Sequence, residues 1–246
     1  LFTEGASIIT FSFSMNKDDL KTMFSFKNNN FDSKEILSLS VPSVSSRIIG
    51  NICYFFEPII LTNILLFKGY SNSFILSEYG AYNAYAISTL TIPSFFINAI
   101  SLALIPEISK YNEEGNILYI KKRLKEGIFF SFIIGLFSTF IIYIFRYRLL
   151  LILYKTTLGV DYIKYLAPFF ILFYFENIFA SFMQANGKAK ITLRITVVSS
   201  IIKLVSLASL SFLKIGIYSL LISEIINILF VVSINYFYIH SYLKNR

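Results

Sequence analysis

Tryptophan is absent from this chain of 246 residues, and cysteine and histidine each occur once. Cys53 has no second cysteine with which to form a disulfide within the chain. Metal sites of the cysteine and histidine type need three or four such ligands, and this chain offers only Cys53 and His240. We therefore expect no metal ion and no cofactor.

Charged residues are scarce as well. They make up 15% of the chain, against about 25% in soluble proteins, while hydrophobic residues make up 56% and the mean hydropathy is +0.67. This composition predicts an all-α protein that crosses the lipid bilayer several times. The net charge of +8 would suggest nucleic acid in a soluble chain, but the basic residues fall mostly in short loops between apolar segments. Membrane orientation explains them, and we expect no nucleic-acid partner.

Sequence motifs of common enzymes are missing too. The chain has no P-loop, no HExxH motif, no GxSxG motif and no paired aspartates of the glycosyltransferase type, and it contains only four aspartates. Several ionisable residues nevertheless lie within apolar segments. Ionisable groups in the membrane without catalytic motifs favour a transporter over an enzyme.

Six membrane-spanning helices are predicted. The central one covers residues 79–110 and has no charge between Ala81 and Ile105, enough to cross a hydrocarbon layer of about 30 Å. Its Pro93 frees a backbone carbonyl that a neighbouring helix must satisfy, so we expect it inside the bundle and ending at Pro106. Since tryptophan is absent, the aromatic belt at the membrane interface is predicted to be tyrosine. The tyrosines near predicted span ends are Tyr79, Tyr82, Tyr143, Tyr147, Tyr162, Tyr165, Tyr236 and Tyr238. The other spans are expected at about residues 36–67, 127–145, 165–185, 191–213 and 216–239.

The domain organisation follows from these spans. Residues 1–15 are apolar but too short to cross, and we expect them to be the end of a truncated preceding helix. Residues 16–35 form a polar, basic linker, and residues 36–246 form a six-helix transmembrane lobe. Long connectors are expected at residues 107–126 and 146–164. Fourteen lysines and arginines fall on the side of the linker and six on the other side, which predicts that both ends of the lobe face the cytoplasm.

Polar residues inside the spans are the candidates for function. A charge at the bilayer centre costs about 2.5–3.5 kcal/mol, so a charge retained there is expected to face a cavity or a partner. The candidates for a substrate cavity are Arg47, Asn51, Glu57, Glu176, Gln184, Lys203, Glu224 and Asn227. As an alternative, the charged residues pair only to hold helices together, and the amides make interhelical hydrogen bonds. Pro58 and Pro93 are candidate hinges or static kinks.

Two segments resemble a known superfamily. YGAYNAYAISTLTIPSFFINAISLALIPEISK is similar to the second helix of the C-terminal half of the multidrug/oligosaccharidyl-lipid/polysaccharide exporters, with an aromatic-Gly start, a mid-helix proline and an ALIPxIS ending. LGVDYIKYLAPFF resembles a later helix start of that family, which a Gln-x-x-Gly-Lys loop follows, here at residues 184–188. The branch it most resembles is that of the stage V sporulation protein B-like polysaccharide flippases. The resemblance covers residues 36–242.

This resemblance implies a protein of two six-helix lobes around a central cavity, in which the present chain is the C-terminal lobe and the N-terminal lobe is its partner. Such flippases carry an undecaprenyl-diphosphate-linked sugar, such as lipid II of the bacterial cell wall, across the cytoplasmic membrane by alternating access. Arg47 is then the expected contact of the diphosphate, with Lys203 second. One alternative is a cation-coupled multidrug exporter that depends on Glu57 or Glu176. Another is a non-transporting subunit of a polysaccharide synthesis complex.

Overall fold

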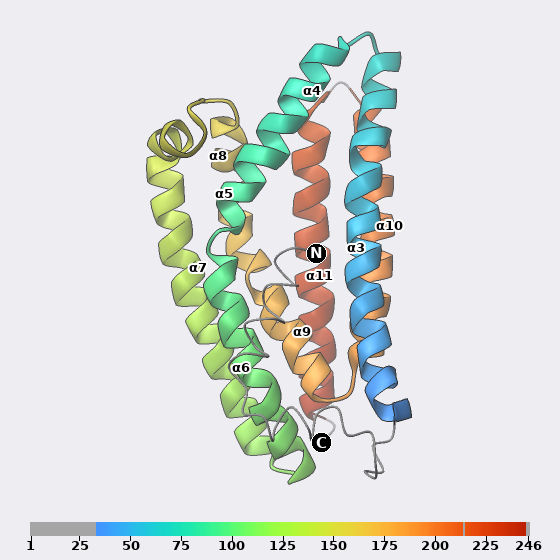
Figure 1. Ribbon diagram of the computed structural model, residues 1–246, viewed down its shortest axis with the longest axis vertical. Coiled ribbons are helices and arrows are strands. Elements are labelled where there is room, and N and C mark those ends of the chain that lie inside the picture. Colours follow the sequence, from blue (N-terminus) through green and yellow to red (C-terminus); the bar gives the residue numbers. More distant parts are fainter. Residues whose placement is uncertain (1–32, 214, 245–246) are drawn as a thin grey trace, which may run out of the picture. The chain divides into compact units, whose positions relative to one another are not determined.

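The computed structural model describes residues 33–213 and 215–244, and every regular element within these ranges is a helix (Figure 1). Contacts divide the chain into two units, Leu1–Leu37 and Ser38–Arg246. The helices that pack together belong to the second unit. The expected truncated helix at residues 1–15 and the linker up to residue 32 lie outside the described residues.

The described helices follow one another with short connections. They are α3 (Ser33–Phe67), α4 (Asn72–Gly80), the π-helical segment η1 (Ala81–Ile87), α5 (Ser88–Thr91), α6 (Ser94–Glu113), α7 (Ile117–Tyr154), α8 (Val160–Phe173), α9 (Phe175–Ala185), α10 (Ala189–Ser211) and α11 (Tyr218–Lys244). In the described part of the chain, five stretches are long and apolar enough to cross a membrane, and there are six if the bent pair Asn72–Thr91 and Ser94–Glu113 counts as one span. The predicted all-α fold is confirmed.

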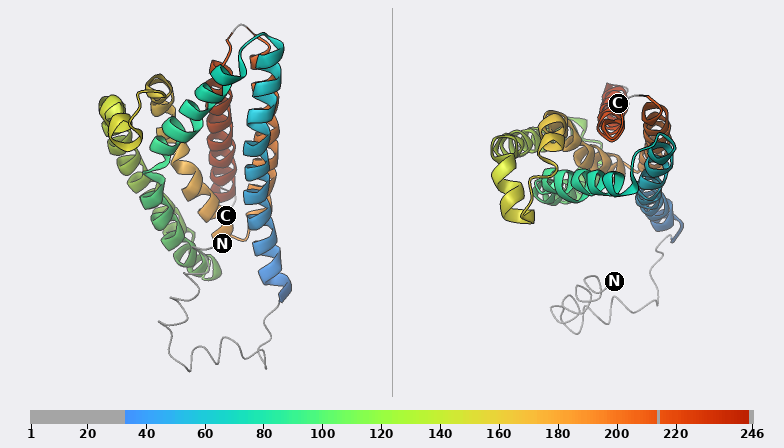
Figure 2. Two further views of the ribbon diagram at one scale, coloured as in Figure 1. Left: turned by 45° about the horizontal axis from the view of Figure 1, so that its top comes forward. Right: turned by 90° about the horizontal axis from the view of Figure 1, so that it is seen from above.

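The second unit is built from neighbouring helices that pack in pairs. α6 packs against α7 and α9, α8 packs against α7 and α11, and α10 lies beside α11. α3 lies along α10 (Figures 1 and 2), where the Cys53 Sγ donates to the carbonyl of Ser200 at 3.7 Å. In the end-on view of Figure 2, the chain from α4 to α6 crosses from the side of α3 to the side of α7.

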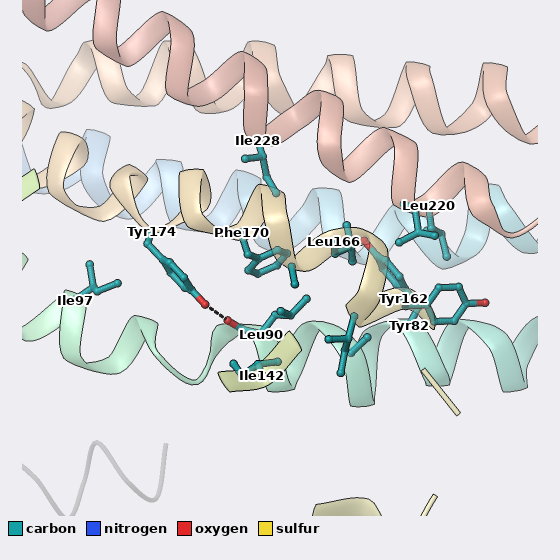
Figure 3. Close-up of a cluster of buried hydrophobic side chains, with 14 of the residues drawn as sticks. Tyr82, Leu90, Ile97, Ile142, Tyr162, Leu166, Phe170, Tyr174, Leu220 and Ile228 are labelled. Atoms are coloured by element: carbon teal, nitrogen blue, oxygen red, sulfur yellow. Dashed lines mark hydrogen bonds between the residues drawn. The ribbon is translucent and has the colours of Figure 1, made fainter. Parts of the chain in front are cut away.

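Pro93 interrupts the central span as the sequence predicts. The helix axis bends by 51° between Thr91 and Ser94. The carbonyl of Leu90, just before this break, accepts a hydrogen bond of 2.7 Å from the hydroxyl of Tyr174, which joins α8 to α9 (Figure 3). Tyr174 is fully buried in the apolar cluster drawn there. A neighbouring side chain thus satisfies the backbone where the helix is broken.

Pro106 does not end the central span, contrary to the prediction. α6 continues through Pro106 to Glu113, and only residues 114–116 connect it to α7. Pro106 lies on an exposed part of the helix surface, whereas Leu104 and Ile108 are buried. The packing of this face against α7 and α9 stabilises the helix beyond the proline. The expected long connector at residues 107–126 is therefore wrong.

α7 is also longer than predicted. Its 38 residues extend about 57 Å, well beyond a hydrocarbon layer of about 30 Å. The charged segments at residues 121–126 and 146–148 are helical, so the connector expected at residues 146–164 shrinks to residues 155–159. Charges end the apolar segment in the sequence, but they do not end a helix.

One face of α7 consists of small residues at every fourth position. Gly127, Ser131, Gly135 and Thr139 are all buried there. A Cβ at Gly135 would lie 2.5 Å from Cδ2 of Tyr174, and one at Gly127 would lie 2.6 Å from Cδ1 of Leu104. Small residues at this spacing let membrane helices approach closely.

Gly135→Ala tests this close approach. We expect the variant to lower the free energy of unfolding by about 1–3 kcal/mol, because the new methyl group must displace a buried ring. Gly80→Ala is the matched control, since a Cβ there meets nothing within 4 Å, and we expect it to change stability by no more than about 1 kcal/mol. Both are measured by denaturation of the full-length protein in detergent micelles. Equal stability of the two variants would contradict the packing described here.

A candidate functional site of buried charges beside a polar cavity

Three charged side chains meet in the interior of the lobe. The Nζ of Lys203 on α10 lies 2.5 Å from Oε1 of Glu57 on α3 and 2.6 Å from Oε2 of Glu224 on α11. All three residues are at most 3% exposed. We call Glu57, Lys203 and Glu224 the ion cluster. It joins three helices that are far apart in the sequence.

Helical spacing brings these charges together. Each of them lies on the buried face of its helix, between buried residues three or four positions away. These neighbours are Cys53 and Leu61 on α3, Ser199 and Leu207 on α10, and Leu220 and Ile228 on α11. Because the same faces pack the helices against one another, the three charged side chains are almost entirely shielded from water. The charges of Glu57, Lys203 and Glu224 must therefore neutralise one another.

Two tyrosines complete the surroundings of the ion cluster. The hydroxyl of Tyr82 on η1 donates to Oε2 of Glu224 at 3.5 Å. The ring of Tyr54 on α3 lies against Lys203, with Nζ 4.3 Å from the ring centroid, a cation–π contact. Tyr82 is 2% exposed and lies within the core of the lobe. π-helical turns such as η1 often occur at functional sites.

The charges of the ion cluster do not balance. Two carboxylates surround one ammonium group, so the ionised cluster carries one negative charge in excess. Removing a single partner from a buried ion pair costs about 3–5 kcal/mol, because the other charge stays buried and uncompensated. Lys203 is the only cation in contact with the two carboxylates among the described residues.

A polar cavity of about 230 Å³ adjoins the ion cluster. Its walls come from α3, α8, α9, α10 and α11, and they include Lys203 and Tyr54. Glu176 and Asn177 face it from α9, and Asn227 faces it from α11. The Oδ1 atom of Asn227 is buried and has no hydrogen-bond partner among the described residues. The cavity therefore offers a free acceptor and a further carboxylate next to a net negative cluster.

The structure brings together some of the predicted site residues and separates others. Glu57, Lys203 and Glu224 form the ion cluster, and Glu176 and Asn227 line the adjoining cavity. Arg47 and Asn51 are exposed on α3, and Gln184 is exposed near the end of α9. The alternative in which buried charges pair with one another applies to Glu57 and Lys203, and not to Arg47, which forms no ion pair within the described ranges.

Only one of the two candidate hinges, Pro58 and Pro93, interrupts a helix. α3 continues without a break through Pro58, whereas the chain leaves its helical path at Pro93.

Sequence reasoning missed part of the site. Tyr54 lies three residues before Glu57, one helical turn away, so this spacing could have indicated that Tyr54 lies on the same side of the helix as Glu57. Asn177 follows Glu176 directly, yet it also lines the cavity. The role of Tyr82 depends on the π-helical segment, which shifts the helix register, and nothing in the sequence announces that shift.

The MatE family model matches residues 58–209 of this chain, which is more than half of its length. The chain belongs to the MatE family. Its MatE region starts on α3, directly after Glu57, and ends on α10, after Lys203, so it covers most of the cavity wall. The predicted exporter superfamily is thereby confirmed.

Relatives of this MatE chain include two proteins of Bacillus subtilis (strain 168). Stage V sporulation protein B is 30% identical over 179 residues, which are 73% of this chain and 35% of the relative. Sporulation protein YkvU is 24% identical over 142 residues, 58% of this chain and 32% of the relative. The chain thus spans about a third of the length of these relatives. The predicted sporulation-protein branch agrees with the first of them.

Solved structures support the same MatE fold. A multidrug resistance MATE family transporter of the MOP superfamily, in an outward-facing conformation, superposes with a TM-score of 0.76 at 15% identity. The match covers 90% of this chain and 49% of that one. A MATE in the bent conformation gives a TM-score of 0.77 at 14% identity and covers 90% and 48%. At this identity the likeness shows the fold alone, a helical lobe that makes up about half of such a chain.

Proposed function

We propose that this chain is one lobe of an exporter that moves an undecaprenyl-diphosphate-linked sugar, a precursor of peptidoglycan or another cell-envelope polysaccharide, across the bacterial cytoplasmic membrane. Alternating access between two lobes carries the sugar outward. The similarity to stage V sporulation protein B supports this reading. The observation that carries it is the exposed cation Arg47 on a membrane-spanning helix.

Arg47 lies on the same side of α3 as residues of the polar cavity. Tyr54 follows it by seven residues, two helical turns, and the cavity begins at Gly50 between them. Asn51, four residues after Arg47, is exposed as well. A guanidinium group binds phosphate oxygens through two parallel hydrogen bonds, and it remains charged at all physiological pH values. We therefore assign the diphosphate contact to Arg47.

A second lobe would close this face. In the proposal, α3 borders the central cavity between the lobes, and a linker at residues 16–35 connects it to the preceding lobe. Both ends of this lobe then face the cytoplasm, a proposal that the excess of lysine and arginine on one side supports. Lys203, the other candidate for the diphosphate, is bound to two carboxylates instead, so we assign it to holding the cavity wall.

A cation-coupled multidrug exporter is the alternative function. The excess of carboxylates over ammonium groups favours it, because Glu176 adds to a cluster that already carries one negative charge. With the free Oδ1 of Asn227, the cavity of about 230 Å³ could take a small cation. This alternative predicts that Glu176→Gln abolishes ion-driven efflux. A non-transporting subunit of a synthesis complex would move no lipid-linked sugar and would copurify with a synthase.

Arg47→Ala tests the proposed function. We expect the full-length protein with this substitution to translocate a lipid-linked sugar about 10- to 100-fold more slowly, because charge-assisted hydrogen bonds contribute about 1.5–3 kcal/mol. Translocation is measured in proteoliposomes by the accessibility of the sugar to an external enzyme. Arg148→Ala, which removes an exposed arginine from α7, is the control and should transport at the parent rate. Unchanged transport by Arg47→Ala would overturn the assignment.

A further inference from the structure

A second and larger cavity, of about 580 Å³, lies away from α3, between α7, α9 and α11. It is within the usual size range of ligand pockets, roughly 300–1,000 Å³. Four basic side chains line it, Lys121 and Lys125 on α7 and His240 and Lys244 on α11. The proposed transport function makes no use of this cavity.

On both α7 and α11, the residues that line the cavity are three or four positions apart, so they lie on one face of each helix. On α7, Lys121, Lys125 and Ile128 are four and three residues apart, and on α11 His240 and Leu243 are three apart. Lys121 lies in the second turn of α7, and Lys244 is the last residue of α11. These two helix ends lie at the same end of the bundle (Figure 1). Because these basic side chains flank the apolar parts of α7 and α11, we expect them at the level of the lipid headgroups.

The positive charge of this cavity is not compensated locally. Among the described residues that line it, none is acidic. The nearby Glu107 and Glu126 are both bound to Arg123, at 2.9 Å and 2.8 Å. In the described part of the chain, neither Lys121 nor Lys125 has a carboxylate within ion-pair distance. Two lysines are thus available to bind an anion.

The rest of the cavity is apolar. Leu124 and Ile128 of α7, Phe179 of α9 and Leu243 of α11 line it. An occupant that fits both parts needs an anionic head and a hydrocarbon tail. Basic pockets between membrane helices near the surface are suited to anionic lipid headgroups.

We propose that this cavity binds an anionic phospholipid, with the phosphate between Lys121, Lys125 and Lys244 and the first part of an acyl chain along Leu124 and Ile128. A soluble anion would leave the apolar wall uncovered, and an apolar molecule would leave the lysines without a counterion. The site shares only α11 with the ion cluster and none of its residues, so it stands whether or not the proposed substrate is correct.

Native mass spectrometry of the full-length protein tests this site. The protein in detergent is titrated with phosphatidylglycerol and with phosphatidylcholine of the same acyl chains. We expect the parent to prefer phosphatidylglycerol and Lys121→Gln/Lys125→Gln to lose about 30-fold in affinity for it, since each lysine near an anionic surface contributes roughly 1 kcal/mol. Lys122→Gln/Lys190→Gln removes the same charge from two exposed lysines outside the cavity and should bind as the parent does.

Two outcomes would overturn the proposal. The first is equal retention of phosphatidylglycerol by the two double variants. The second is displacement of the lipid by glycerol 3-phosphate at equal concentration, which would indicate a site for soluble phosphates. Melting temperatures of both variants within the error of the parent exclude unfolding as the cause of any loss.

Discussion

Replacing Lys203 by methionine is expected to lower the free energy of unfolding by about 3–5 kcal/mol. Methionine has nearly the same length and fills the same space, so packing is kept and the charge alone is lost. Glu57 and Glu224 would then remain within one buried site, each without the ammonium group that now lies 2.5 Å and 2.6 Å away. Two uncompensated carboxylates at these positions repel each other and lack water.

Lys190→Met is the matched control for this prediction. Lys190 lies on the same helix but is exposed, and exposed substitutions of this kind change stability by less than about 0.5 kcal/mol. Both variants are made in the full-length protein and compared by denaturant titration in micelles. A Lys203→Met variant as stable as Lys190→Met would show that the ion cluster contributes nothing to the packing of α3, α10 and α11.

Neutralising the whole ion cluster is expected to restore stability. In Glu57→Gln/Lys203→Met/Glu224→Gln no buried charge remains, and the amide oxygen at position 224 can still accept from the hydroxyl of Tyr82. Buried ion clusters replaced by neutral residues of similar volume are often as stable as the parent, so we expect the triple variant to lie within about 1 kcal/mol of it.

A transport assay of the triple variant distinguishes two interpretations of these charges, a role in the substrate path and a role in helix association alone. If they border the substrate path, the triple variant should translocate at least about tenfold more slowly, since charges kept in a membrane at this cost are mostly functional. Proteoliposomes with equal amounts of folded protein provide the measurement. A triple variant that is stable and transports at the parent rate would show that Glu57, Lys203 and Glu224 serve helix association alone.

Much of the fold could be predicted from the sequence, because hydrophobic length and composition decide which segments cross a membrane. The membrane-spanning segments follow from this rule, and the bend follows from Pro93, which cannot continue the hydrogen-bond pattern of a helix. The ends of α6 and α7 do not, because helix ends depend on packing as well as on charge. The sequence around Pro106 predicts that the helix ends there. The buried residues Leu104 and Ile108 nevertheless keep α6 helical past Pro106.

The candidate site was predictable only in part. Burial in a membrane requires Glu57 and Lys203 to find partners, so their pairing is a consequence of composition. That Glu224 shares the same ammonium group depends on the rotation of α11 against α10, which no spacing within one helix determines. Arg47 and Asn51 share a face as their spacing indicates, but that face is exposed on α3 instead of being covered by α10.

The central claim is that the face of α3 bearing Arg47 and Asn51 borders a water-filled substrate path. Cysteine labelling tests this most directly, in full-length protein in which Cys53 and all other cysteines are replaced by serine. We predict that Asn51→Cys reacts with a membrane-impermeant thiol reagent and that lipid-linked sugar slows the reaction. Phe137→Cys, at an apolar position of α7 that is 66% exposed, should stay unlabelled. An Asn51→Cys variant as unreactive as Phe137→Cys would place this face against lipid and contradict the claim.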